Sequence, residues 1–133
     1  MLGKDSKLLH HQVVNIIQHH TDITGDIHCK GDLRLDGTVK GNVYVSGRLV
    51  MGHDAVIEGT IECENAEISG KVKGDIKVKE TLQLKKHCQI EGDIYTKKLI
   101  IEAEAVFNGK CIMKNKEQEI KNKINDKSQL VSV

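Results

Sequence analysis

The sequence has few of the residues that anchor an ordinary globular core. Its 133 residues include no Trp, no Pro, one Phe and two Tyr. Aromatic side chains bury the largest areas, so most of the buried surface must come from Ile, Val and Leu. The composition therefore predicts a thin interior made of small repeated layers.

The sequence also lacks an excess of either charge and any long apolar run. The sequence has 20 Lys and Arg residues and 19 Asp and Glu residues, which give a net charge of +1. Direct nucleic-acid binding is therefore not expected. No segment approaches the roughly 18 apolar residues that cross a bilayer, and the N-terminus has no secretory signal pattern. The four cysteines show no CxxC spacing. We expect a cytoplasmic protein with reduced thiols.

Glycine, in contrast, is abundant and periodic. Eleven of the 12 glycines lie between Gly25 and Gly109. Six of them recur at intervals of 16, 18, 15, 18 and 17 residues, each with apolar residues two positions before and after: Gly25, Gly41, Gly59, Gly74, Gly92 and Gly109. This alternation is typical of short β-strands with one buried face. Because the same pattern returns in every unit, like residues are expected to stack in columns.

These observations predict an all-β fold, a single-domain parallel β-helix of about five to six coils. We expect an N-terminal tail over residues 1–20, the β-helix over 21–113 and a polar tail over 114–133. An antiparallel sandwich or barrel would explain the strands but not the columns. The predicted core columns contain Val39, Val43, Ile57, Ile61, Val72, Ile76, Ile90 and Ile94.

The two tails carry their own patterns. Ser6 is a candidate cap for a helix over Ser6–His20, whose apolar stripe would contain Leu8, Leu9, Val13, Ile16 and Ile17. Such a helix would cap the first coil, lie on a membrane surface or bind a partner. The C-terminal tail has five Lys and three acidic residues, which predicts a solvated segment.

Three segments of the repeat, Gly31–Val43, Ile68–Ile76 and Ala105–Cys111, resemble the bactofilins, a family of bacterial polymer-forming cytoskeletal proteins. The resemblance covers about Thr21 to Met113. It implies a right-handed β-helix that assembles end to end into non-polar filaments without nucleotide. It also implies a scaffold for cell-shape or cell-wall enzymes, often at the cytoplasmic membrane. The tails of the family are often Pro-rich, and this chain departs from that pattern.

The open ends of such a helix are the candidate functional surfaces. Each end exposes unpaired backbone groups and an apolar layer, so it must be capped or must pair with another copy. We expect the polymerisation interface to use Phe107 and Val106 in the last coil and Ile23 and Ile27 in the first. The resemblance assigns Phe107 to polymerisation, whereas its position is equally consistent with filling the last core layer. The expected partner is a homopolymer, with no cofactor.

The sequence gives little support for metal binding or catalysis. In the pairs His28–Cys29 and His87–Cys88, the two neighbouring side chains would point to opposite faces of a strand, so they could not bind one metal ion from the same side. The best candidate for a zinc site is therefore His10–His11 with His19–His20. Met51–Gly59 resembles a turn of the left-handed hexapeptide acyltransferases, with His53 as a general base. The variable intervals break the constant hexapeptide order. A non-enzymatic structural protein is therefore predicted. Its alternative is a β-helical adaptor or binding module, monomeric or dimeric, whose N-terminal helix docks a partner.

Overall fold

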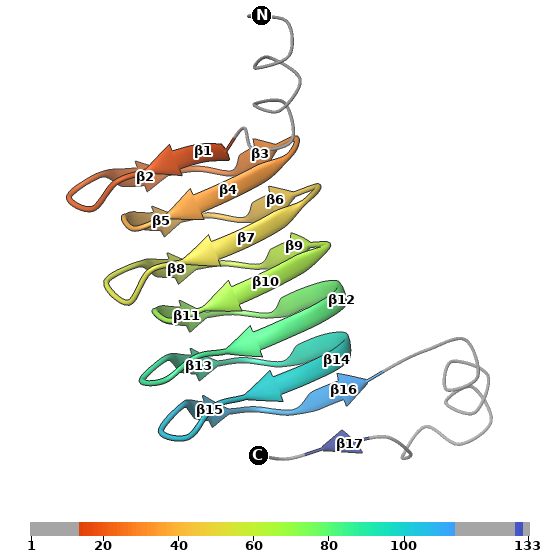
Figure 1. The fold of residues 1–133 in the computed structure, drawn as a ribbon. Helices are drawn as coiled ribbons and strands as arrows, with labels where there is room; N and C mark the ends of the chain where they lie inside the picture. Colours follow the sequence, from red (N-terminus) through yellow and green to blue (C-terminus); the bar gives the residue numbers. More distant parts are fainter. Residues whose placement is uncertain (1–13, 114–129, 132–133) are drawn as a thin grey trace, which may run out of the picture.

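Each repeat unit forms one coil of a right-handed parallel β-helix (Figure 1). The computed structural model describes residues 14–113 and 130–131. Within each of six coils the chain runs through three short strands, and each strand pairs in parallel with its equivalent in the next coil. The predicted parallel β-helix is therefore confirmed, at the upper end of the expected number of coils.

The strands form three faces that wrap around one axis. The first face consists of β1 (Val14–Ile17), β4 (Asp32–Leu35), β7 (Arg48–Met51), β10 (Asn65–Ile68) and the second halves of β12 (Ile76–Leu84) and β14 (Ile94–Ile101). The second face consists of β2 (Asp22–Thr24), β5 (Thr38–Lys40), β8 (Val56–Glu58), β11 (Lys71–Lys73), β13 (Gln89–Glu91) and β15 (Val106–Asn108). The third face consists of β3 (Ile27–Cys29), β6 (Val43–Val45), β9 (Ile61–Cys63), the first halves of β12 and β14, and β16 (Cys111–Met113).

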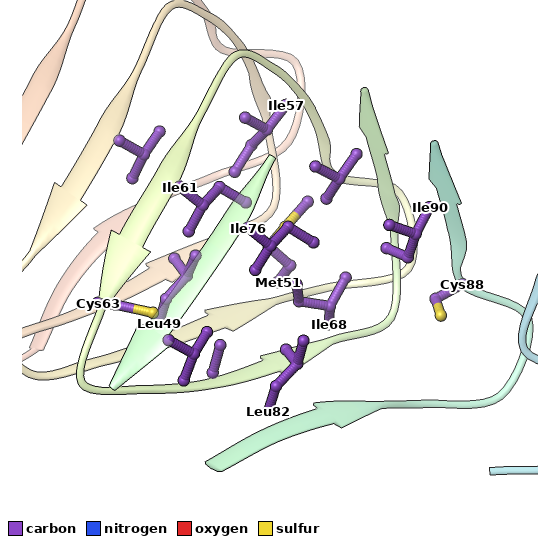
Figure 2. Close-up of a cluster of buried hydrophobic side chains, with 14 of the residues drawn as sticks. Leu49, Met51, Ile57, Ile61, Cys63, Ile68, Ile76, Leu82, Cys88 and Ile90 are labelled. Carbon is purple, nitrogen blue, oxygen red and sulfur yellow. The ribbon is translucent and has the colours of Figure 1, made fainter. Parts of the chain in front are cut away.

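The core is a set of five inward columns that run the length of the rod. Register places, for example, Val39 beside Ile57 and Ile57 beside Val72. In coils 2 to 5 every inward side chain of these columns is 4 % exposed or less. Figure 2 shows Leu49, Ile57 and Ile76 converging on the axis from three faces. The eight residues named as core columns are all 1 % exposed or less. No coil closes this interior alone, so stability depends on neighbouring coils.

The irregular interval between glycines comes from two corners of the coil, because the strands keep a constant length. The corner after the first face has two residues in coils 2 and 4, as at Asp36–Gly37, and four in coils 3, 5 and 6, as at Gly52–Ala55. The corner between the third and first faces has one or two residues. These alternatives account for all five intervals. The extra residues thus lie at the corners, and at one of them, between Val78 and Thr81, the register of the β12–β14 pairing shifts.

The repeated glycine sits where successive coils approach most closely. At Gly59, which has a φ of +155°, a Cβ atom would stand 2.1 Å from the carbonyl oxygen of Gly41. Beside this column, side-chain oxygens bridge coils: Oδ1 of Asn42 accepts a hydrogen bond from the amide of Thr60 at 2.9 Å. Oδ1 of Asp75 accepts in the same way from the amide of Asp93 at 3.1 Å. The polar residue after the glycine therefore satisfies backbone donors at a corner.

The N-terminal residues correct one prediction. The helix expected over Ser6–His20 is wrong for its second half, because Val14–Ile17 forms strand β1 and His19–His20 form a turn. Strand β1 pairs in parallel with β4, with Asn15 beside Leu33 and Ile17 beside Leu35. The first coil thus begins before Thr21. The remaining part of the predicted helix, including Ser6, Leu8, Leu9 and Val13, lies outside the described residues.

The C-terminal residues add a strand that the sequence did not predict. Strand β17 (Leu130–Val131) pairs antiparallel with β16, with Cys111 beside Val131 and Ile112 beside Leu130. Every other pairing among the described strands is parallel. Figure 1 shows β17 beyond β16, at the C-terminal end of the rod.

Candidate interface at the two ends of the rod

The inward columns are closed in the middle of the rod and open at its ends. In the first coil, Ile17, Ile23, Ile27 and Cys29 are only partly buried, although the residues stacked on them in coil 2 are 4 % exposed or less. In the last coil, Leu99, Ile101 and Met113 are partly buried in the same way. Each terminal coil therefore leaves a partly exposed apolar layer.

Large exposed apolar side chains are also concentrated at the ends. Four such residues are found in the part of the chain that the structure describes: Val14 at 41 %, Ile16 at 60 %, Ile100 at 40 % and Val106 at 48 % exposure. All four belong to the first or the last coil. The exposed flanks of coils 2 to 5 carry no comparable residue within the described ranges. The largest exposed apolar side chains of the described residues thus lie on the flanks of the two terminal coils.

The two interface residues predicted for the last coil have different environments. Phe107 lies in β15, stacks beside Ile90 of coil 5 and is 7 % exposed. Val106 is the preceding residue and points outward, in a surface column that contains Gln89 and Lys71. The structure therefore places Phe107 in the end layer and Val106 on the flank of the same coil.

The two interface residues predicted for the first coil lie together in its end layer. Ile23 stacks on Val39, and Ile27 stacks on Val43. Asn15 occupies the column that Leu33 and Leu49 continue, and its Nδ2 contacts Sγ of Cys29 at 3.1 Å. The N-terminal layer thus contains an amide where the C-terminal layer has Leu99.

Sequence reasoning missed Asn15, Ile17, Ile101 and Met113 as end-layer residues. The repeat spacing could have identified Ile17, which stands 18 residues before Leu35, within the range of the repeat. This relation was hidden because Asn15 interrupts the apolar alternation at the position equivalent to Leu33. For Ile101 and Met113 the columns were recognised, but only the structure shows that their burial is incomplete in the last coil.

The flanks of the rod are polar and carry ion pairs between coils. On the first face, Glu67 lies 2.9 Å from Arg48 and 3.8 Å from Lys85, and Lys85 lies 3.2 Å from Glu102. These side chains are between about a quarter and a half exposed, so each pair contributes little to stability, about 0–1 kcal/mol. The network nevertheless keeps this flank hydrated, in contrast to the ends.

The cysteines and histidines do not assemble a reactive centre in the described residues. All four cysteines are free, and burial raises the pKa of the Cys63 thiol to about 12, so it stays protonated. His28 stacks on Tyr44 at 4.7 Å, while His87 faces Glu104 at 3.3 Å. No group of three metal-ligating side chains occurs within residues 14–113, and His10–His11 lie outside the described part.

The acyltransferase alternative expected a left-handed coil, and the observed coil is right-handed. His53 is exposed in the four-residue corner between β7 and β8, among Asp36, Asp54 and His19. A coil whose corners change length does not reproduce the hexapeptide pattern. The hexapeptide interpretation is therefore wrong for the fold.

Among the described residues there is no helix with the length and hydropathy that a bilayer crossing requires. What the described residues do offer is a polar β-helical rod with apolar, incompletely closed ends. The molecule is thus a β-solenoid of the kind that can be extended by adding further coils.

Comparison with known proteins agrees with this class. The family model "Bactofilin", described as polymer-forming cytoskeletal, matches residues 15–112. Bactofilin BacO of Myxococcus xanthus is 36% identical over 96 residues, which cover 72% of this chain and 76% of BacO. Bactofilin BacP of the same organism is 32% identical over 91 residues, 68% of this chain and 36% of BacP.

A solved structure shows the same architecture. The structure of the cytoskeletal bactofilin BacA, determined by solid-state NMR, matches with a TM-score of 0.70 and 33% identity. The match covers 78% of this chain and 99% of the BacA chain. This chain belongs to the bactofilin family of polymer-forming cytoskeletal proteins.

Proposed function

We propose that the chain assembles end to end into filaments through its two terminal coils, without nucleotide and without catalysis. The supporting observation is that all five inward columns are buried in coils 2 to 5, whereas several are only partly buried in coil 1, and those of Leu99, Ile101 and Met113 are only partly buried in coil 6. Stacking another coil on an end would complete the burial of Ile17, Ile23 and Ile27, or of Leu99, Ile101 and Met113. Full burial of one such aliphatic side chain contributes about 1.5–3 kcal/mol.

We propose further that the filaments are non-polar, with like ends joined. A head-to-tail joint would continue each column and place Asn15 against Leu99. The Asn15 amide would then be buried beside an aliphatic side chain, which costs about 1–3 kcal/mol when its polar atoms lack partners. A joint between two C-terminal ends avoids this cost because that layer is apolar. A joint between two N-terminal ends whose two-fold axis passes through the first face would bring two Asn15 amides within reach of each other.

The test compares end-layer and flank substitutions by sedimentation of the purified chain without nucleotide. Phe107→Arg and Ile101→Arg each place a charge in the C-terminal layer, and both are expected to leave small soluble species at concentrations where the unaltered chain pellets. Gln89→Arg adds the same charge to the flank of coil 5, where Lys71 already stands in the column, and should pellet normally.

Two results decide the assignment of residues. Val106→Arg is expected to pellet normally if only the end layer forms the joint, and to remain soluble if the flank of the last coil takes part. Filaments that persist in folded Phe107→Arg and Ile101→Arg chains would remove the C-terminal layer from the interface. Far-ultraviolet circular dichroism and thermal unfolding identify variants that fail to fold.

We propose that these filaments act as scaffolds for cell-shape or cell-wall machinery at the inner face of the cytoplasmic membrane. Membership of a cytoskeletal family supports this role, and a filament would present the same flank residues once per subunit. Co-sedimentation with anionic and with zwitterionic vesicles tests the membrane contact. In cells, Ile101→Arg should disperse a fluorescent fusion, whereas a monomeric adaptor would keep its localisation.

A further inference from the structure

The outer edge of β16 is an acceptor for an antiparallel strand. Strand β16 is the last strand of the third face, paired with β14 on its inner side and with β17 on its outer side. The pairing with β17 reverses the direction that every other described pairing follows. The edge where a further coil would continue the solenoid is thus occupied by a strand of the opposite direction.

The direction of β17 matches a symmetric joint and not a continued coil. A further coil stacked head to tail would bring a parallel strand onto β16. A two-fold axis that joins two C-terminal ends reverses the strands of the second copy, so the second copy's β16 would arrive antiparallel. Strand β17 therefore holds the place that this second strand would take.

Strand β17 covers only part of the C-terminal end. The outer edge of β15 and that of the second half of β14 have no partner strand among the described residues. The pairing of β17 extends over two residue pairs, Cys111 with Val131 and Ile112 with Leu130. A pairing of this length contributes only a few hydrogen bonds, each worth about 0.5–1.5 kcal/mol, so a larger interface would displace it.

We propose that β17 is a removable cap that competes with a second copy of this chain for the outer edge of β16. Release of β17 opens the edge for antiparallel pairing between the two β16 strands, and the apolar end layers close over each other. This inference rests on the proposed end-to-end assembly, because it states what controls one of the two joints. The cap would set the concentration at which C-terminal ends join.

The test removes the backbone donors of β17 in the full chain. Leu130→Pro with Val131→Pro removes both backbone N–H donors of the strand, and Pro is incompatible with a regular ladder. Leu130→Val with Val131→Ile is the matched control, since it alters the same positions and keeps both donors. Two quantities are measured: hydrogen exchange of the β16 amides below the assembly threshold, and the threshold itself by sedimentation.

The proline variant is expected to exchange faster at β16 and to assemble at a roughly tenfold lower threshold, which corresponds to a cap of about 1.4 kcal/mol. The control variant should match the unaltered chain in both measurements. Adding Phe107→Arg to the proline variant should abolish the lowering of the assembly threshold, because this lowering depends on the C-terminal joint.

The outcomes separate the cap from the assembly. If the proline variant shows unchanged hydrogen exchange at the β16 amides, the proposed cap is overturned. The proposal is also overturned if exchange is faster but the assembly threshold is unchanged in a chain that still forms filaments. A gain that survives Phe107→Arg overturns the competition at this end. Faster exchange in a chain that forms no filaments at any concentration shows that end-to-end assembly is what failed, and the competition is overturned with it.

Discussion

Replacing one glycine of the stacked column tests whether coil contact limits the stability of the rod. Gly59→Ala places a methyl group 2.1 Å from the Gly41 carbonyl oxygen, where ordinary contact needs at least 3.4 Å. The Gly41 oxygen is a backbone atom and the new Cβ is fixed to the backbone of residue 59, so relief requires that coils 2 and 3 separate locally by about 1.3 Å, the difference between these distances. The neighbouring hydrogen bond from the Gly41 amide to the Glu58 carbonyl, 3.0 Å long, would stretch beyond bonding range.

A second glycine separates this contact from backbone strain. Gly25 also has a positive φ, +126°, but nothing lies within 4 Å of the position that its Cβ would take. Gly25→Ala should therefore cost only the strain of the conformation, about 1–3 kcal/mol. Gly59→Ala adds the clash and the disturbed ladder, and we expect a total above about 4 kcal/mol, which is exceptional for a single substitution.

A third glycine controls for fraying of the terminal coils. Gly109 belongs to the last coil, and its Cβ would stand 1.9 Å from the carbonyl oxygen of Gly92. Gly109→Ala should destabilise the chain more than Gly25→Ala, although both positions lie in terminal coils. Urea unfolding followed by circular dichroism, below the assembly threshold, measures all three costs. Equal costs for Gly25→Ala and Gly59→Ala would refute the reasoning, because contact between coils would then contribute nothing.

Cys63 and Glu102 each contribute to the way stability changes with pH. Because burial raises the pKa of Cys63 from 9.0 to about 12, the folded state holds a proton that the unfolded state loses, and stability falls as pH rises across that interval. Cys63→Val, whose side chain matches Val45 and Val78 in the column, should reduce the fall of the urea midpoint with pH in this range. Part of the fall should remain, because burial also raises the pKa of Cys88 and of Cys111. At acid pH, the hydrogen bond from the Lys86 amide, together with the Lys85 ammonium, lowers the pKa of Glu102 below 4.5. Stability is therefore lost as pH falls through the lowered pKa, and Glu102→Gln should weaken this dependence; an unchanged acid profile would contradict the contact.

The repeat could be predicted from the sequence because its physical cause is local and recurrent. Ile57 and Ile61 flank Gly59 at alternate positions, and the same arrangement returns in each coil. A strand with one buried face requires that alternation, and a close approach of coils requires glycine. The same reasoning failed at Ile16 and Ile17, where a helix stripe and a strand fit the spacing equally well. Only pairing with β4 decides between them, because β1 gains its hydrogen bonds from a strand of the next coil.

The sequence by itself determined the coil, its columns and its polar flanks, since every coil repeats the same balance of apolar, polar and glycine positions. The tertiary structure decided where that repetition stops and what lies at each end. Three features of the ends depend on neighbours that, within the described residues, are present on one side and absent on the other. They are Asn15 in the first layer, the partial exposure of Ile101 and Met113, and the antiparallel pairing of β17 with β16. Periodicity contains no information about such boundaries, because burial at an end is a property of the stack and not of the unit.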